Sequence, residues 1–382
     1  MVRVGNLGAK THQLANVLEK NPHLGVATLV DKSGRFHQVP GTPRVVILSD
    51  LDGTWVGKDK EALQKLNEGI KRTCFDYTNA GLKVVWGYIT ARPPSRTIKS
   101  GAVMPPDLSV CFNGGTIFRG MPTATKGLEM QDWARLNATS GFQSQNVLEM
   151  AKDLTKSSKF SNLKTQTVGE VVGNPDADAC NYVATVCIEN ESIKLVANET
   201  SDMFKEESFK VPNQVKEFLS ELEQKTKSKN IEYKITGPYL FSGKPYVMFD
   251  IAAPHANKGE AVNFLTKNYD HRNVIVIGDG GNDISMMDND GRNIIVVGKD
   301  HILREKAAGL SQDSVILRPE DEPCSEGVLA GIKQHLANIA QRLKNEGVLS
   351  KDFNPELNKQ PYHWEHQAPK MTSEEKMREY YA

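Results

Sequence analysis

The sequence lacks an excess of charge of either sign, because its 47 lysines and arginines equal its 47 aspartates and glutamates. A balanced chain has no overall field that attracts nucleic acid or an anionic membrane surface, so we expect neither as a partner. It also lacks an apolar run long enough to cross a membrane and the apolar core of an N-terminal signal peptide. These absences indicate a cytoplasmic protein.

Cysteine is scarce as well, with five residues among 382. The five are odd in number, scattered and free of C-x-x-C pairs, which excludes a disulfide framework and a cysteine-based zinc site and is typical of a reducing compartment. The length is sufficient for one large domain or two ordinary ones.

The most informative stretch is an apolar run, Val45–Leu48, that is followed closely by Asp50, Asp52 and Gly53. Such a run predicts a buried parallel strand whose C-terminal end opens into a site. Two carboxylates two positions apart project to the same side of an extended chain, and glycine permits a sharp turn close to a ligand. The alternative is a simple Asp-Gly turn after a core strand.

Strand and helix patterns alternate from residue 45 to about 118, which predicts a doubly wound parallel sheet. Helical spacing of apolar residues predicts a helix over 59–80, and a strand follows at Leu82–Ile89. Thr90 and Arg92 come directly after that strand and could hold an oxyanion, although both residue types are also common in strands and on surfaces. A third strand, 108–112, ends in the turn Asn113-Gly114-Gly115.

Residues 119–245 have a different pattern. Amphipathic helices are predicted at about 144–156 and 212–228, and strand-like runs lie at 164–172, 181–188, 231–236 and 245–252. Helices followed by strands within an otherwise alternating sheet predict an inserted α+β domain. No nucleophile-base pairing is evident in it, so we interpret it as a lid or specificity module.

A second informative stretch begins after the insert. Lys258 opens a predicted helix, where a surface charge is the simpler alternative, and a buried strand from 273 then ends in Gly278-Asp279. The next turn carries Asn282 and Asp283, and one of these would be enough to cap the following helix. The glycines allow close backbone approach, and amides at a helix start favour an anion.

Together these stretches indicate one chemistry. Asp50 and Asp279, arriving from two strand ends, make an all-oxygen site suited to Mg²⁺ shared with a substrate phosphate. One aspartate could attack phosphorus to form an aspartyl-phosphate, and a second nearby carboxylate could move protons. Lys258, Thr90 and the amides near Gly53 would hold the phosphoryl oxygens.

The four stretches resemble the four motifs of the haloacid dehalogenase-like (HAD) phosphohydrolases. Asp50-x-Asp52-Gly53-Thr54 is similar to motif I, Thr90 to motif II, Lys258 to motif III, and Gly278-Asp279-x-x-Asn282-Asp283 to motif IV. The order, the spacing and the insert are similar to the Cof-type and sucrose-phosphate-phosphatase branch, which has a large C2-type α/β cap. The resemblance covers roughly 45–335 and implies a Rossmann-like core with an inserted α+β cap.

The resemblance also implies residue roles. Asp50 is expected to be nucleophile and metal ligand, Asp52 general acid/base and a ligand through its backbone carbonyl, and Asp279 and Asp283 members of the Mg²⁺ site. Phosphate binding is implied for Thr54, Thr90, Lys258 and Asn282. Substrate binding is expected of Arg92, Asn113 and Gly114; an alanine follows Thr90 where many relatives have glycine, which leaves the role of Arg92 open.

The predicted organisation is an N-terminal appendage (1–43), a core (44–118 and 246–349), a cap (119–245) and a polar tail (350–382). The predicted function is Mg²⁺-dependent hydrolysis of a small phosphorylated metabolite through an aspartyl-phosphate, and the substrate class that we expect is a sugar phosphate. A phosphotransferase or phosphomutase of the same superfamily is the enzymatic alternative. A catalytically silent metabolite-binding or scaffold protein is the alternative from another class.

Overall fold

The computed structural model describes residues 43–56, 60–99, 106–120, 129–189, 211–240, 246–288 and 291–357. The predicted N-terminal appendage, apart from Pro43, and the tail beyond residue 357 lie outside these ranges.

The larger of two sheets has seven strands in the order β11-β10-β9-β1-β2-β3-β4. Every neighbouring pair is parallel except β3 and β4, which are antiparallel. The strands are β1 (Arg44–Ser49), β2 (Lys83–Ile89), β3 (Leu108–Cys111), β4 (Thr116–Arg119), β9 (Val274–Gly278), β10 (Asn293–Val296) and β11 (Val315–Leu317).

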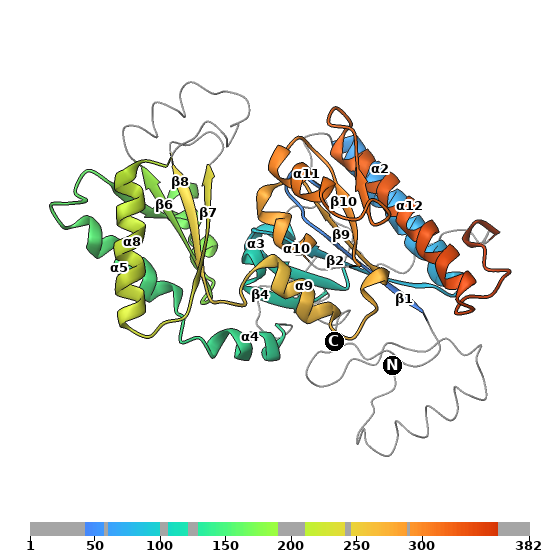
Figure 1. Cartoon of the computed structure of the whole chain (residues 1–382), viewed down its shortest axis with the longest axis horizontal. Coiled ribbons are helices and arrows are strands. Elements are labelled where there is room, and N and C mark those ends of the chain that lie inside the picture. The colour runs from blue at the N-terminus through green and yellow to red at the C-terminus, as the bar shows by residue number, and fades with distance from the viewer. Residues whose placement is uncertain are drawn as a thin grey trace, which may run out of the picture.

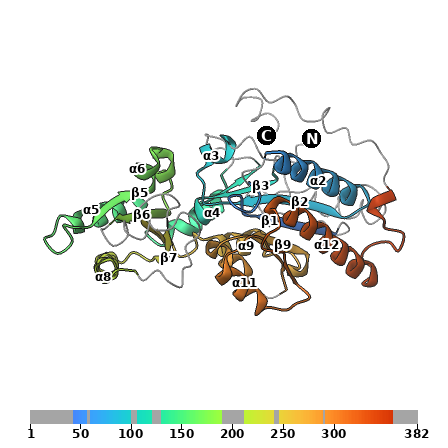
Figure 2. The same ribbon diagram turned by 90° about the horizontal axis from the view of Figure 1, so that it is seen from above.

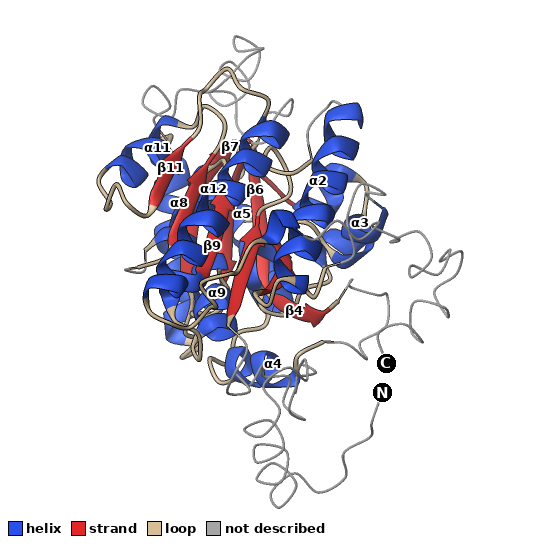
Figure 3. Cartoon of the chain, turned by 90° about the vertical axis from the view of Figure 1, so that its right-hand side faces the viewer, coloured by secondary structure: helices blue, strands red, loops and turns tan. Residues whose placement is uncertain are grey.

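Helices cover both faces of this sheet, as Figure 3 shows. One apolar layer lies under α2 and α12, and another under α9, α10 and α11. Because both faces are covered, the central strands are apolar along almost their whole length, as their sequence predicts. The helices of this part are α2 (Lys60–Asn79), α3 (Pro94–Lys99), α4 (Gln131–Ala138), α9 (Lys258–Thr266), α10 (Ile284–Met287), α11 (His301–Ala308) and α12 (Cys324–Asn345).

The chain changes direction across the sheet between β1 and β9. After β1 it adds β2 and β3 on one side, and it later returns to add β9, β10 and β11 on the other. The helices on either side of this switch point lie on opposite faces, so their loops diverge and leave a crevice at the carboxyl ends of the strands. Ser49 at the end of β1 pairs with Ile277 near the end of β9, which places Asp50 and Asp279 at this crevice.

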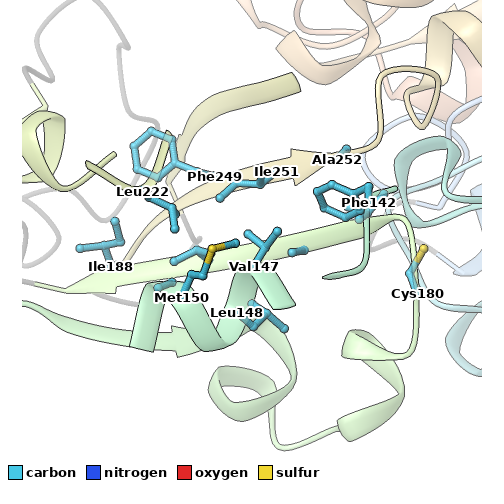
Figure 4. Close-up of a cluster of buried hydrophobic side chains, with 14 of the residues drawn as sticks. Phe142, Val147, Leu148, Met150, Cys180, Ile188, Leu222, Phe249, Ile251 and Ala252 are labelled. Carbon is cyan, nitrogen blue, oxygen red and sulfur yellow. The ribbon is translucent and has the colours of Figure 1, made fainter. Parts of the chain in front are cut away.

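The smaller sheet is antiparallel, with strand order β5-β6-β8-β7, and two helices cover it. Figures 1 and 2 show this cap at one end of the molecule, beside the larger sheet. Its apolar interior joins helix residues such as Val147 and Leu222 to strand residues such as Phe249 and Ile251 (Figure 4). Its elements are α5 (Ser144–Thr155), β5 (Lys164–Thr167), α6 (Val168–Val172), β6 (Val183–Glu189), α8 (Asn213–Ser228), β7 (Lys234–Leu240) and β8 (Val247–Ala252).

Both predicted boundaries of the cap differ from the structure. Strand β8 was placed in the core by the boundary at 245, but it pairs with β6 and β7 in the cap sheet. At the other boundary, Glu129 bridges to Phe118 of β4, and Trp133 of α4 packs in the core layer. The cap therefore spans about 140–252. Sheet pairing moves the segment with β8 from the core to the cap, and the burial of α4 moves the segment before residue 140 from the cap to the core.

Two local predictions are also wrong. The run 164–172 was predicted as one strand, but it divides into β5 and α6 at Thr167, whose side chain accepts from the amide of Glu170 while Glu170 accepts from the amide of Thr167. This reciprocal capping ends the strand and starts a helix. The tail was predicted to begin at 350, but Phe353 packs against the ring of Tyr77 and is buried in the layer under α2 and α12.

All five cysteines are free thiols. Within the described ranges, no helix combines the length and the apolar character that a membrane span requires.

Candidate active site

The loop after β1 carries Asp50 into the crevice with 4% of its surface exposed. Leu51 and Trp55, which follow it in the chain, are fully buried, and the ring of Trp55 packs at a tilt against Trp86 of β2, which anchors the loop. Gly53 has φ +79°, and a Cβ there would overlap the carboxylate of Asp279. Glycine is therefore required at this position, because the backbone has a positive φ and passes directly beside the end of β9.

Lys258 connects the motifs of the two halves of the core. It is the first residue of α9, whose start is capped by Asn257, and only 1% of its side chain is exposed. Its ammonium donates to Asp50 Oδ1 at 2.6 Å and to Asp283 Oδ1 at 2.7 Å. The alternative of a solvated surface charge is wrong for this lysine.

Asp283 is fully buried and bound through both carboxylate oxygens. While Oδ1 accepts from Lys258, Oδ2 accepts from the backbone amides of Asp279 and Gly280 at 3.0 and 3.2 Å. Asp283 thus fixes the turn that presents Asp279 and fixes the position of the lysine. The hydroxyl of Thr54 donates to Asp279 Oδ1 and lies 3.4 Å from Asp50 Oδ2, so in this structure Thr54 links the two carboxylates.

This cluster contains more acidic than basic groups. Burial raises the pKa of Asp50 well above its usual 3.8, against the opposing effect of the Lys258 charge. Burial, followed by the nearby charge of Asp283, raises the pKa of Asp279 to about 7. Burial lowers the pKa of Lys258, but Asp283 and Asp50 outweigh it and raise that pKa above 10.5, so the lysine stays charged. One ammonium faces three carboxylates, and a cation would stabilise their ionised forms.

The cluster has the geometry of a metal site. Asp50, Asp279 and Asp283 each offer a carboxylate oxygen, and these oxygens all lie within 4.8 Å of one another. Oxygens on opposite sides of an octahedral Mg²⁺ are about 4.2 Å apart, because each Mg–O distance is about 2.1 Å. The donor type and the uncompensated negative charge fit a hard divalent cation, and the oxygens are close enough to converge on one with a small adjustment. Asp283 is held on both oxygens by contacts of 2.7 to 3.2 Å, whereas the Thr54 hydroxyl lies 3.4 Å from Asp50 Oδ2. Asp50 and Asp279 are therefore the freer donors.

Asp52 is oriented differently from Asp50. More than half of its side-chain surface, 55%, is exposed, and Arg92 holds it through two hydrogen bonds, one of them 2.7 Å from Nε to Oδ2. The hydrogen bond to Asp52 is the main cause that raises the pKa of Arg92. The structure thus gives Arg92 a definite contact, in which it positions the carboxylate predicted to act as acid and base.

The remaining predicted phosphate ligands lie around the same crevice. Thr90 directly follows β2 and is fully buried, and its hydroxyl accepts from the amide of Arg92 at 3.1 Å. Asn282 lies in the turn after β9 and lines the space between core and cap. Neither side chain makes a hydrogen bond with Asp50 or Lys258.

The turn after β3 brings the cap to the core. Asn113, at φ 52°, donates from Nδ2 to Asp250 Oδ2 of cap strand β8 at 2.8 Å. Gly114 has φ +105°, and a Cβ there would overlap the backbone of Asn257, the cap residue of α9. Asn113 therefore contacts the cap, and Gly114 allows the lysine-bearing helix to approach. Their role in substrate binding stays a prediction.

Sequence reasoning missed Asp250, a carboxylate with 6% exposure that also accepts from Thr185 at 2.6 Å. Burial raises its pKa above 3.8. One signal was present in the sequence, namely a single acid inside the apolar strand Val247–Ala252, where an unpaired charge is costly. Nothing in the sequence of β8 indicated that it faces the catalytic crevice.

Comparison with known proteins identifies the family of this chain. The family model of the haloacid dehalogenase-like hydrolases matches residues 47–313, which include all four motifs. No match was found among curated proteins.

Solved structures share the fold. The sucrose-phosphatase of Synechocystis, solved with sucrose and phosphate, has a TM-score of 0.51 at 19% identity, covering 77% of this chain and 98% of that one. A haloacid dehalogenase-like hydrolase of Bacillus subtilis has a TM-score of 0.45 at 15% identity, covering 77% and 92%. A HAD subclass IIB sugar phosphatase has a TM-score of 0.40 at 15% identity, covering 80% and 99%. The first of these likenesses supports the predicted core-and-cap fold.

Proposed function

This chain belongs to the haloacid dehalogenase-like hydrolase family, and from that premise we propose that it is a Mg²⁺-dependent phosphatase whose substrate is a small phosphorylated metabolite of the sugar-phosphate class. The observation that carries the proposal is the buried chain of contacts from Asp50 through Lys258 to Asp283, with Asp279 alongside at the switch point of the sheet. A capping turn or a structural salt bridge needs only one carboxylate for one lysine. We further propose that the enzyme acts in a reducing, cytoplasmic setting.

In the first half-reaction, Asp50 attacks phosphorus in line with the leaving oxygen. A bond forms between its carboxylate oxygen and phosphorus while the bond from phosphorus to the leaving oxygen breaks, which gives an aspartyl-phosphate and an alcohol. Asp52 supplies the proton that the leaving oxygen needs. Lys258 neutralises charge beside Asp50, and its two carboxylate partners hold it still.

In the second half-reaction, Asp52 removes a proton from water, and the water oxygen attacks phosphorus. The bond between phosphorus and Asp50 breaks, which restores the carboxylate and releases phosphate. Arg92 keeps Asp52 at the mouth of the crevice through both steps.

Asp50 and Asp279 would hold the metal, with the backbone carbonyl of Asp52 as the further ligand that the family implies. When bound, Mg²⁺ supplies positive charge for the phosphoryl oxygens and stabilises the ionised carboxylates.

The test is phosphate release from p-nitrophenyl phosphate and a panel of phosphorylated sugars, with Mg²⁺ and with chelator. We expect release that depends on Mg²⁺ and stops with chelator, and inhibition by Ca²⁺, whose coordination shell is larger and looser. Full activity in chelator, with metal shown to be absent, would contradict the proposal. Transfer of phosphate to an added sugar in preference to water would identify a phosphotransferase instead.

A further inference from the structure

Two adjoining cavities lie between core and cap. One, of about 580 Å³, is lined by Lys258, and the other, of about 390 Å³, by Asp52. Four residues line both cavities and form the shared wall: Asn113, Val183, Asp250 and Asn282.

The position of Asp52 identifies the cavity that takes the leaving group. In-line displacement puts the leaving oxygen on the side of phosphorus opposite Asp50, and the group that protonates this oxygen must lie within hydrogen-bond reach. Asp52 lines only the 390 Å³ cavity. The alcohol part of the substrate therefore occupies this cavity, a step that rests on the proposed function.

The walls of this cavity differ in character. The cap side is largely apolar, with Val168 and Val172 of α6, Ala177 and Met248. The core side contributes two guanidinium groups, Arg92 from the loop after β2 and Arg96 from α3.

Among the described residues, one of the two guanidinium groups of the cavity has no charged partner. Arg92 is neutralised by Asp52 through two hydrogen bonds. Asp250 directs one oxygen to Thr185 and the other to Asn113, and burial favours its neutral form. Arg96, by contrast, has no ion pair or side-chain hydrogen bond with any residue in the described ranges.

We infer that the preferred substrate carries a second anionic group, a carboxylate or a second phosphate, on its leaving alcohol, and that Arg96 binds this group. A guanidinium recognises both anions through paired hydrogen bonds. The carbon skeleton between the ester and the second anion would then lie against the apolar cap wall.

The experiment compares kcat/KM for three phosphate esters with the Mg²⁺-loaded, full-length protein. Glucose 6-phosphate has an uncharged leaving group, 6-phosphogluconate adds a carboxylate, and fructose 1,6-bisphosphate adds a phosphate. The variants are Arg96→Gln, which removes the charge, and Arg96→Lys, which keeps it. Arg135→Gln is the control, because Arg135 is an exposed arginine of α4 outside both cavities.

Wild-type protein is expected to prefer at least one of the two anionic substrates, and the preferred one identifies the anion. Arg96→Gln should reduce this preference about tenfold, the lower end for a charge-assisted hydrogen bond because Arg96 is solvent-exposed. Arg96→Lys should retain much of the preference, and Arg135→Gln all of it.

Two results would overturn the inference: wild-type preference for glucose 6-phosphate, or an Arg96→Gln variant that keeps the ratio of anionic to uncharged substrate. If no ester is hydrolysed, including p-nitrophenyl phosphate, the proposed function itself fails, so the two failures are distinguishable.

Discussion

Asp50 is the nucleophile of the proposed reaction, and its buried environment makes its charged form unfavourable for the stability of the fold. Burial raises its pKa, and so do the negative charges of Asp279 and Asp283, while the Lys258 charge opposes them. Removal of its charge should therefore affect catalysis and stability in opposite directions.

Asp50→Asn should abolish turnover, because an amide does not attack phosphorus, while the melting temperature of the metal-free protein stays unchanged or rises. Asp52→Asn should slow turnover by a factor of about 10² to 10⁴, since it removes proton transfer but leaves the nucleophile. Phosphate release and thermal melts of both variants test this contrast. Near-normal turnover by Asp50→Asn would exclude a covalent intermediate on this residue.

The raised pKa of Asp279 predicts that Mg²⁺ binding depends on pH. Its pKa is raised to about 7, so in the metal-free protein it holds a proton at pH 6 and has lost it at pH 8. Because metal binding requires the carboxylate, the ionisation of Asp279 should by itself raise the apparent affinity for Mg²⁺ about tenfold from pH 6 to pH 8.

Titration calorimetry at several pH values measures this change. In the metal-free state, the free energy of unfolding should change in the opposite direction. The folded pKa of Asp279 lies above the unfolded value of 3.8, so the stability that its protonated form contributes is lost as pH rises towards 7. An affinity for Mg²⁺ independent of pH over this range would contradict the prediction.

At the scale of elements, two helix starts and two strand ends build the site. α9 delivers Lys258, the turn before α10 delivers Asp283, and β1 and β9 deliver Asp50 and Asp279. The turn after β3 determines the position of α9, because Gly114 lies directly against Asn257 at the start of that helix.

Gly114→Ala should therefore displace α9 and misplace Lys258. Gly141→Ala is the matched control, since Gly141 has φ +67° with open space around it. The control should lose about 1 kcal/mol from left-handed strain alone. Gly114→Ala should lose about 1–3 kcal/mol more from the overlap, and most of its activity. Denaturant unfolding and phosphate release check both variants, and equal effects would show that the contact with Asn257 is unimportant.

At the scale of the whole molecule, the cap is the segment that covers the crevice, so we expect it to select substrates. Replacement of residues 140–252 by a Gly/Ser linker should leave a folded core that hydrolyses p-nitrophenyl phosphate weakly and discriminates little among sugar phosphates.

The boundaries of this deletion matter. Replacement of 119–245 should abolish folding, because it removes Trp133 from the core layer and leaves β8 without its partner strands. Circular dichroism and a cooperative melt establish folding of each variant. A folded 140–252 deletion that kept the wild-type ranking of substrates would place specificity in core loops such as the turn at Asn113.

The sequence alone determined the core of this protein. Apolar runs that end in acids marked β1 and β9, and helical spacing predicted a helix over 59–80, where α2 spans Lys60–Asn79. These features are local, because a buried strand and the residues after its carboxyl end are contiguous in the chain. They were therefore visible without a structure, and the structure places Asp50, Asp279, Lys258 and Asp283 together.

Only the tertiary structure decided which surfaces meet across long separations in sequence. Periodicity does not show that Lys258 is buried, that Asp250 faces the crevice from another sheet, or that β8 belongs to the cap, because each depends on partners far away in the chain. The same holds for Arg96, whose position in the cavity depends on how cap and core pack. Sequence therefore fixes which groups are present, while packing fixes their charge state and what they contact.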